Sequence, residues 1–117
     1  MGRLLVHIAT GPENPTRLTL GLRVARMAVE AGHEVSVFLA GDAVDALRPE
    51  TRQDMTGIGI GPAQEHWELL LAGGALVYAS VFSSAARGIF EPPEGVQLVL
   101  PERLVELLFE ADRSVSY

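Results

Sequence analysis

Four short apolar runs, separated by segments of helical character, constrain the fold of this chain most strongly. They occupy residues 4–9, 34–41, 75–80 and 96–100, and a fifth extended segment, residues 113–117, closes the sequence. Continuous apolar runs of this length are typical of strands that are buried on both faces. Because they alternate with helices, we predict one α/β domain over residues 1–117, with three layers and a five-stranded, mainly parallel sheet. The first strand is expected at the centre of that sheet.

The residues between the strands predict where the helices begin and end. Asn14 followed by Pro15 is typical of a helix start and Gly32 of a helix end, so a long helix is expected between them. Further helices are expected over residues 43–48, 63–72, 82–87 and 101–111. Residues 49–62 are polar and then rich in glycine, which indicates a mobile connection without regular structure.

The composition excludes several classes of chemistry. The net charge is −6 and the nine basic residues are all arginine, scattered along the chain, which argues against a nucleic-acid partner. The chain has no lysine for a Schiff base or a P-loop, and no cysteine for a disulfide, a thiol nucleophile or a zinc–thiolate site. No apolar run approaches the roughly 20 residues of a membrane span. We therefore expect a soluble cytoplasmic protein with no membrane partner and no cofactor.

The carboxyl ends of the parallel strands are where an open α/β sheet is expected to bind a ligand. Three loops should meet at that edge, formed by residues 10–14, 41–42 and 80–84. The helix that begins at Pro15 directs free N–H groups toward the same edge, which favours an anion. The candidate ligand-binding residues are Thr10, Gly11, Asn14, Ser80, Ser83 and Arg87. For the serines, capping of the following helix is favoured over a ligand role.

No catalytic or metal-binding set is complete in the sequence. Ser80 does not lie in a Gly-x-Ser-x-Gly elbow, and none of the three histidines is placed to act as its base. We expect His7 to be a hydrogen-bonded core residue, His33 to lie at the opposite edge of the sheet, and His66 to lie on a helix surface. Asp42 and Asp45 lack a third oxygen ligand at a suitable spacing. We predict neither catalytic residues nor a metal site.

The stretch YASVFSSAARGI, residues 78–89, carries a family resemblance. Together with the opening LLVHIATGPENPTRLTLGLRVARMAVEAGHEVSVFLAGDAV and the close GVQLVLPERLVELLFEADRSVSY, it resembles the DsrE/DsrF-like family over the whole chain. In that family a strand leads into a loop with a cysteine, often with a second cysteine three residues on, and then an Arg-Gly pair. Here Ser80 and Ser83 stand at the cysteine positions, and Arg87 and Gly88 are in place.

The resemblance implies a function that this sequence cannot perform unchanged. Cysteine-bearing members carry sulfur as a persulfide in sulfur-relay and sulfur-oxidation systems, usually as homo- or hetero-oligomers, and a serine hydroxyl cannot hold a persulfide. The favoured hypothesis is a non-catalytic binding or scaffold subunit linked to such systems, assembling with itself or with a cysteine-bearing paralogue. The alternative is a small-anion or metabolite-binding protein, or an enzyme, that uses the strand-end cleft around Ser80. We also expect that a cysteine introduced at position 80 would be a reactive thiol.

The first helix has two apolar stripes. One consists of Leu18, Leu22, Ala25 and Val29, and the other of Leu20, Val24, Met27 and Ala31. A helix that covers a sheet needs only one apolar face, so the second stripe must meet a neighbouring helix or another subunit. An association surface is favoured, and we predict a homo-oligomer built from a two-fold dimer.

Overall fold

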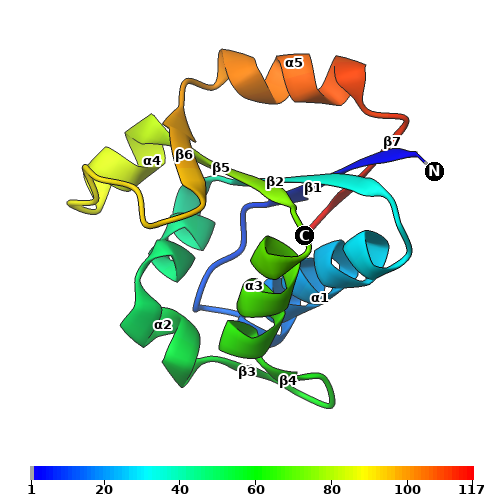
Figure 1. Cartoon of the computed structure of the whole chain (residues 1–117). Coiled ribbons are helices and arrows are strands. Elements are labelled where there is room, and N and C mark those ends of the chain that lie inside the picture. Colours follow the sequence, from blue (N-terminus) through cyan, green and yellow to red (C-terminus); the bar gives the residue numbers. More distant parts are fainter. Residues whose placement is uncertain (1) are drawn as a thin grey trace.

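The computed structural model describes residues 2–117 and has the predicted α/β architecture, with three layers around a parallel sheet (Figure 1). Its elements in chain order are β1 (Arg3–Ile8), α1 (Pro15–Glu30), β2 (Glu34–Leu39), the 3₁₀ helix η1 (Gly41–Leu47), α2 (Pro49–Asp54), β3 (Thr56–Gly57), β4 (Gly61–Pro62), α3 (Ala63–Ala72), β5 (Leu76–Ser80), α4 (Val81–Ala86), β6 (Val96–Val99), α5 (Glu102–Glu110) and β7 (Arg113–Ser116). Within the described residues, no helix combines the length and hydropathy that a membrane crossing requires.

The five-stranded sheet has the order β6-β5-β2-β1-β7, and every neighbouring pair is parallel. The prediction that the first strand is central is wrong by one position, because β2 occupies the centre and β1 lies between β2 and β7. Ile8 of β1 is in register with Leu39 of β2, and Leu39 is in register with Ala79 of β5. These three strands therefore end at the same level, and the loops that follow them share one edge.

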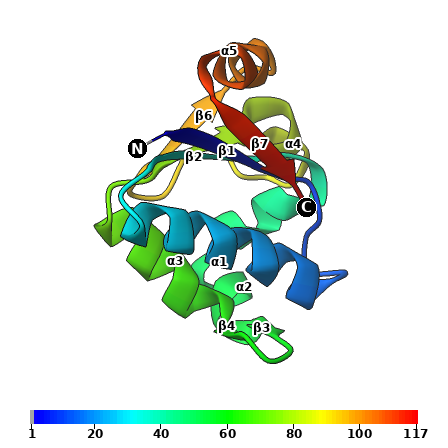
Figure 2. The same ribbon diagram turned by 90° about the vertical axis from the view of Figure 1, so that its right-hand side faces the viewer.

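The two faces of the sheet are covered unequally (Figures 1 and 2). Helices α1 and α3 lie on one face, where the strands contribute alternate apolar residues to the larger core cluster. The other face carries α5, which packs Leu107 against Leu5, Phe38 and Tyr78. Among the described elements α5 is the one helix that crosses this face, so part of the sheet beside it stays open.

The start and end of α1 agree with the sequence signals. The Asn14 Oδ1 accepts a hydrogen bond from the Arg17 N–H, as an N-cap does, and Pro15 is the first helical residue. The helix ends at Glu30, and Gly32 takes up a φ of +88°, which favours glycine.

Residues 49–62 do not form the irregular connection that their composition indicates. They form α2 and the small antiparallel pair β3–β4. Arg52 of α2 is buried, and its guanidinium lies 4.4 Å from the centre of the Trp67 ring of α3. Its Nη1 also donates a hydrogen bond to Ala46 O (2.7 Å). The order of this segment therefore depends on contacts with distant parts of the chain, which local composition does not reveal.

Candidate functional site

The three predicted loops meet at the carboxyl edge of the sheet. Gly11 lies so close to the η1 segment that a Cβ atom built on it would be 2.1 Å from the Asp42 carbonyl oxygen. The Gly41 N–H donates a hydrogen bond to Ser83 Oγ (2.9 Å), which joins the end of β2 to α4. The structure thus brings the loops after β1, β2 and β5 into direct contact.

The two serines at the cysteine positions have structural hydrogen bonds. Ser80 Oγ accepts a hydrogen bond from the Ser83 N–H (3.3 Å) and caps the amino end of α4. The Ser80 side chain is buried, and the Ser83 hydroxyl is engaged by Gly41. Capping, which the sequence favours over a ligand role, is therefore what the geometry of Ser80 supports.

Arg87 is held within a cluster of four charged side chains. Its guanidinium pairs with the Asp42 carboxylate, and its Nε lies 3.6 Å from Asp45 Oδ1. Arg48 pairs with the same Asp45 oxygen (3.2 Å) and donates a second hydrogen bond to the Arg87 carbonyl oxygen. The two arginines and two aspartates neutralise one another, so Arg87 offers little free charge to an anionic ligand. The sequence analysis considered Asp42 and Asp45 only as metal ligands and missed their pairing with Arg87.

The loop before α1 carries its own carboxylate. The Gly11 N–H donates a hydrogen bond to Glu13 Oε1 (2.8 Å), while Asn14 caps the helix. Thr10 is half-buried, and no hydrogen bond of its hydroxyl occurs among the described residues. An incoming anion would meet the Glu13 carboxylate beside the helix start, which opposes the electrostatic attraction that the helix end provides.

The histidines do not supply a base to this edge. His33 is at the amino end of β2, where its Nδ1 accepts a hydrogen bond from the Gly2 N–H (3.0 Å). His66 is buried, contrary to the prediction of a surface position. Its Nε2 lies 2.6 Å from the Ile60 carbonyl oxygen and its Nδ1 lies 3.1 Å from Arg26 Nη1. These contacts tie α3 to α1 and to the β3–β4 turn, so the role of His66 is structural.

His7 differs from its prediction in another way. It is half-buried and meets Phe38 edge-to-face with ring centres 6.0 Å apart, but its buried Nε2 has no hydrogen-bond partner among the described residues. Burial lowers the pKa of the His7 imidazole below its ordinary value. Protonation therefore favours the unfolded chain, in which that pKa is normal.

We expect the stability contributed by neutral His7 to be complete above the ordinary histidine pKa of about 6.5 and to be lost as the pH falls below it. In His7→Phe, the unfolding free energy should fall less than in wild type between about pH 7.5 and about pH 5.5, a range that spans the normal titration. Urea denaturation at both pH values measures this difference. Gln53→Phe, which places a phenylalanine at an exposed residue that does not titrate, is the control and should lose as much unfolding free energy as wild type between the two pH values. An equal loss in His7→Phe would contradict the expectation.

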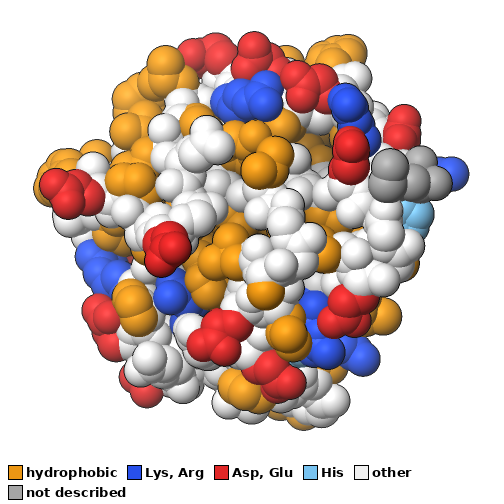
Figure 3. All heavy atoms as spheres, viewed as in Figure 1, with side chains coloured by type: hydrophobic (Ala, Val, Ile, Leu, Met, Phe, Trp, Pro, Cys, Tyr) orange, Lys and Arg blue, Asp and Glu red, His pale blue; other side chains and the backbone are white. Residues whose placement is uncertain are grey.

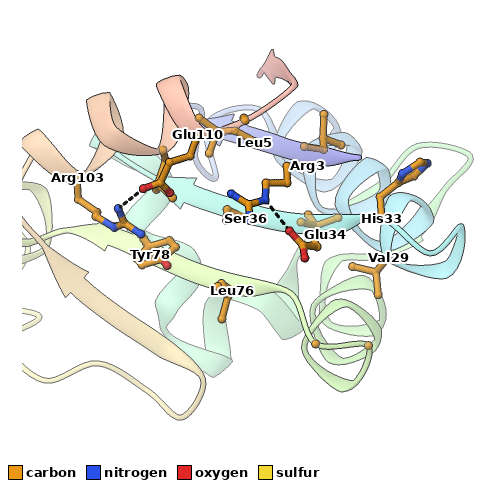
Figure 4. A pocket seen from close by; sticks show the side chains of 16 residues that line it. Arg3, Leu5, Val29, His33, Glu34, Ser36, Leu76, Tyr78, Arg103 and Glu110 are labelled. Atoms are coloured by element: carbon orange, nitrogen blue, oxygen red, sulfur yellow. Dashed lines mark hydrogen bonds and ion pairs between the residues drawn. The ribbon is translucent and has the colours of Figure 1, made fainter. Parts of the chain in front are cut away.

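One hollow beside the sheet lies at the opposite edge from the predicted site. A groove of about 540 Å³ runs between α5 and the amino-terminal half of the strands (Figure 4). Its arginines and glutamates are already paired, because Arg3 Nε lies 2.8 Å from Glu34 Oε2 and Arg103 Nη1 lies 3.3 Å from Glu110 Oε1. Among the described residues, no three metal-ligating side chains cluster there or elsewhere.

Comparison with known proteins identifies the fold and the family. The family model described as the DsrE/DsrF-like family matches residues 3–117. The chain belongs to this family. The crystal structure of the ychN protein from E. coli is similar to this DsrE/DsrF-like protein over 100% of both chains, with 25% identity and a TM-score of 0.83.

A second solved structure extends the likeness of the fold. It is a conserved protein of unknown function, BT1422, from Bacteroides thetaiotaomicron. It aligns with 99% of this chain and 95% of its own, at 15% identity and a TM-score of 0.71. No curated protein matches the sequence. This DsrE/DsrF-like protein has no cysteine anywhere in its sequence.

The burial of Ser80 revises the expectation that a cysteine at this position would react readily. The side chain is 6% exposed, so in Ser80→Cys we expect the thiol to react with Ellman's reagent at least about tenfold more slowly in the native protein than in urea, because reactivity requires access. Ala85→Cys, at an exposed position of the same helix, is the matched control and should react rapidly in the native protein. Rapid labelling of the native Ser80→Cys variant would show that the loop opens.

Proposed function

We propose that this DsrE/DsrF-like protein is a non-catalytic binding or scaffold subunit that carries no persulfide itself and assembles with its own copies or with a cysteine-bearing paralogue. One observation carries the proposal: the loop that bears the cysteine in the family resemblance holds Ser80, whose hydroxyl caps α4. The alternative, a small-anion or metabolite site at this edge, has less support. Arg87 is paired with two aspartates and the Gly11 N–H with Glu13, so few groups remain to bind such a ligand.

The second apolar stripe of α1, which consists of Leu20, Val24, Met27 and Ala31, exposes less apolar area for a contact than the sequence indicates. Val24 packs against the main core, and Leu20 is half-buried. Met27 is 51% exposed, and Ala31 is exposed at the end of the helix. A substitution of Met27 can therefore test self-association through this stripe without disturbing the fold.

In Met27→Glu we expect self-association to weaken by at least about tenfold, because a carboxylate buried in an apolar contact loses its hydration. Sedimentation equilibrium gives the association constant, and circular dichroism should show an unchanged fold. Gln53→Glu adds the same charge at an exposed residue of α2 and should leave assembly intact. If Met27→Glu associates as wild type does, α1 is not the contact, and a wild-type monomer at micromolar concentration would refute self-assembly.

A further inference from the structure

Helix α5 is apolar on the side that faces away from the sheet as well as on the side that packs against it. Val105, Leu108 and Phe109 are 54%, 44% and 88% exposed. Their spacing of three and four residues places them on one face of the helix. Leu104 and Leu107 already serve the smaller core cluster, so the fold does not need this second apolar face. We call Val105, Leu108 and Phe109 the α5 surface.

The α5 surface stands clear of the rest of the fold. In Figures 1 and 2, α5 lies on the side of the sheet opposite α1, α2 and α3 and projects farthest from the strands. The residue that leads into α5, Leu100, is 52% exposed and adds to the apolar area. A cluster of large exposed hydrophobic side chains on one helix is typical of a contact with another molecule.

The charges beside the α5 surface are mainly acidic. Glu102 and Glu106 precede Phe109 by seven and three residues, so they border the apolar stripe along its length. Residues 91–113 contain Glu91, Glu94, Glu102, Glu106, Glu110 and Asp112, against two basic residues, Arg103 of α5 and Arg113 of β7. Arg103 Nη1 lies 3.3 Å from both Glu106 and Glu110, so its charge is already engaged. Figure 3 shows several acidic side chains over α5, with a basic side chain and hydrophobic side chains beside them.

This distribution of charge discriminates between the possible occupants. A second copy that used the same surface would bring two acidic rows together, and the one arginine of α5 is already paired within its own chain. Like charges across an interface oppose association. A basic partner would instead complement the row. The ridge made by residues spaced three and four apart is a shape against which another helix packs well.

We propose that the α5 surface binds an amphipathic helix of a different protein, whose apolar face is flanked by arginine or lysine. The proposal rests on the function proposed above, that of a binding subunit, and adds the chemistry of one partner. Apolar contact with Phe109 and Leu108 supplies the affinity, and the glutamates set the orientation and exclude acidic partners.

The test uses two synthetic helical peptides with leucine at positions i, i+3, i+4 and i+7, one flanked by lysine and the other by glutamate. Fluorescence anisotropy of the labelled peptides should show binding of the lysine peptide and at least about tenfold weaker binding of the glutamate peptide. Phe109→Ser and Glu102→Lys should each lower the affinity for the lysine peptide by about tenfold or more. Glu65→Lys makes the same charge change at an exposed residue of α3 and should leave binding unchanged.

Two outcomes would overturn the inference. One is lysine-peptide binding that is absent, or that is equal in wild type, Phe109→Ser and Glu102→Lys. The other is a wild-type oligomer that Phe109→Ser dissociates, which would make a second copy the occupant. If the oligomer dissociates in Met27→Glu but the wild-type protein does not bind the lysine peptide, only this inference is rejected and the proposed self-assembly stands. A monomer that binds the peptide would reject only the proposed self-assembly.

Discussion

Replacing Arg52 by alanine is expected to lower the free energy of unfolding by about 3 kcal/mol, because buried hydrogen bonds from a charged group contribute strongly and their acceptors would be left unpaired. The side chain is 5% exposed. Its Nε donates to Gln64 Oε1 (2.8 Å) and its Nη1 to Ala46 O (2.7 Å). The guanidinium also stacks over Trp67, so alanine leaves a cavity beside the indole ring. Urea denaturation of both proteins measures the loss.

Arg17→Ala provides the control for this variant. Arg17 is exposed in the first turn of α1, and its removal should change the unfolding free energy by no more than about 0.5 kcal/mol. If Arg52→Ala loses no more unfolding free energy than Arg17→Ala, then the contacts of Arg52 do not hold α2 and α3 together. The order of residues 49–62 would then need another cause.

Replacing Gly11 by alanine is expected to cost about 2 kcal/mol of unfolding free energy, because a new methyl group in a tightly packed region forces the backbone apart. The added Cβ would lie 2.1 Å from the carbonyl oxygen of Asp42 and 2.5 Å from its carbonyl carbon. One of the two strand-end loops must then move, and the pairing of Asp42 with Arg87 should weaken as well. Thermal and urea denaturation give the loss of stability.

Gly2→Ala is the matched control, because its added Cβ would lie 3.3 Å from a flexible carboxylate oxygen of Asp112. We expect its unfolding free energy to stay within about 0.5 kcal/mol of wild type. A Gly11→Ala protein as stable as Gly2→Ala would show that the loops after β1 and β2 are not tightly joined.

The strands and the long helix could be predicted because their signals are local. Each buried strand is a continuous apolar run, and α1 carries its cap residues Asn14 and Pro15 at one end and Gly32 at the other. The extended segment predicted over residues 113–117 forms β7, which lies at one edge of the sheet. The family resemblance agrees with the match over residues 3–117.

The side-chain network could not be predicted, because it depends on pairs distant in sequence. Arg87 pairs with Asp42 at the sheet edge. Arg52, which stacks on Trp67, belongs to a segment whose composition predicts no regular structure. His66 is polar and lies in a helix with exposed glutamates, yet it is buried because Arg26 and Ile60 both contact it. The central position of β2 likewise follows from the crossover connections, which short apolar runs do not specify.

Native mass spectrometry of the wild-type protein after incubation with a persulfide donor tests the central claim most directly, because one spectrum reports both assembly and sulfur transfer. We predict a mass equal to two or more unmodified chains, with no added sulfur. An assembled cysteine-bearing DsrE/DsrF-like protein, treated in the same way, is the positive control for sulfur transfer. A covalent sulfur adduct on this chain would contradict the proposed function, and a single unassembled chain would contradict its self-assembly.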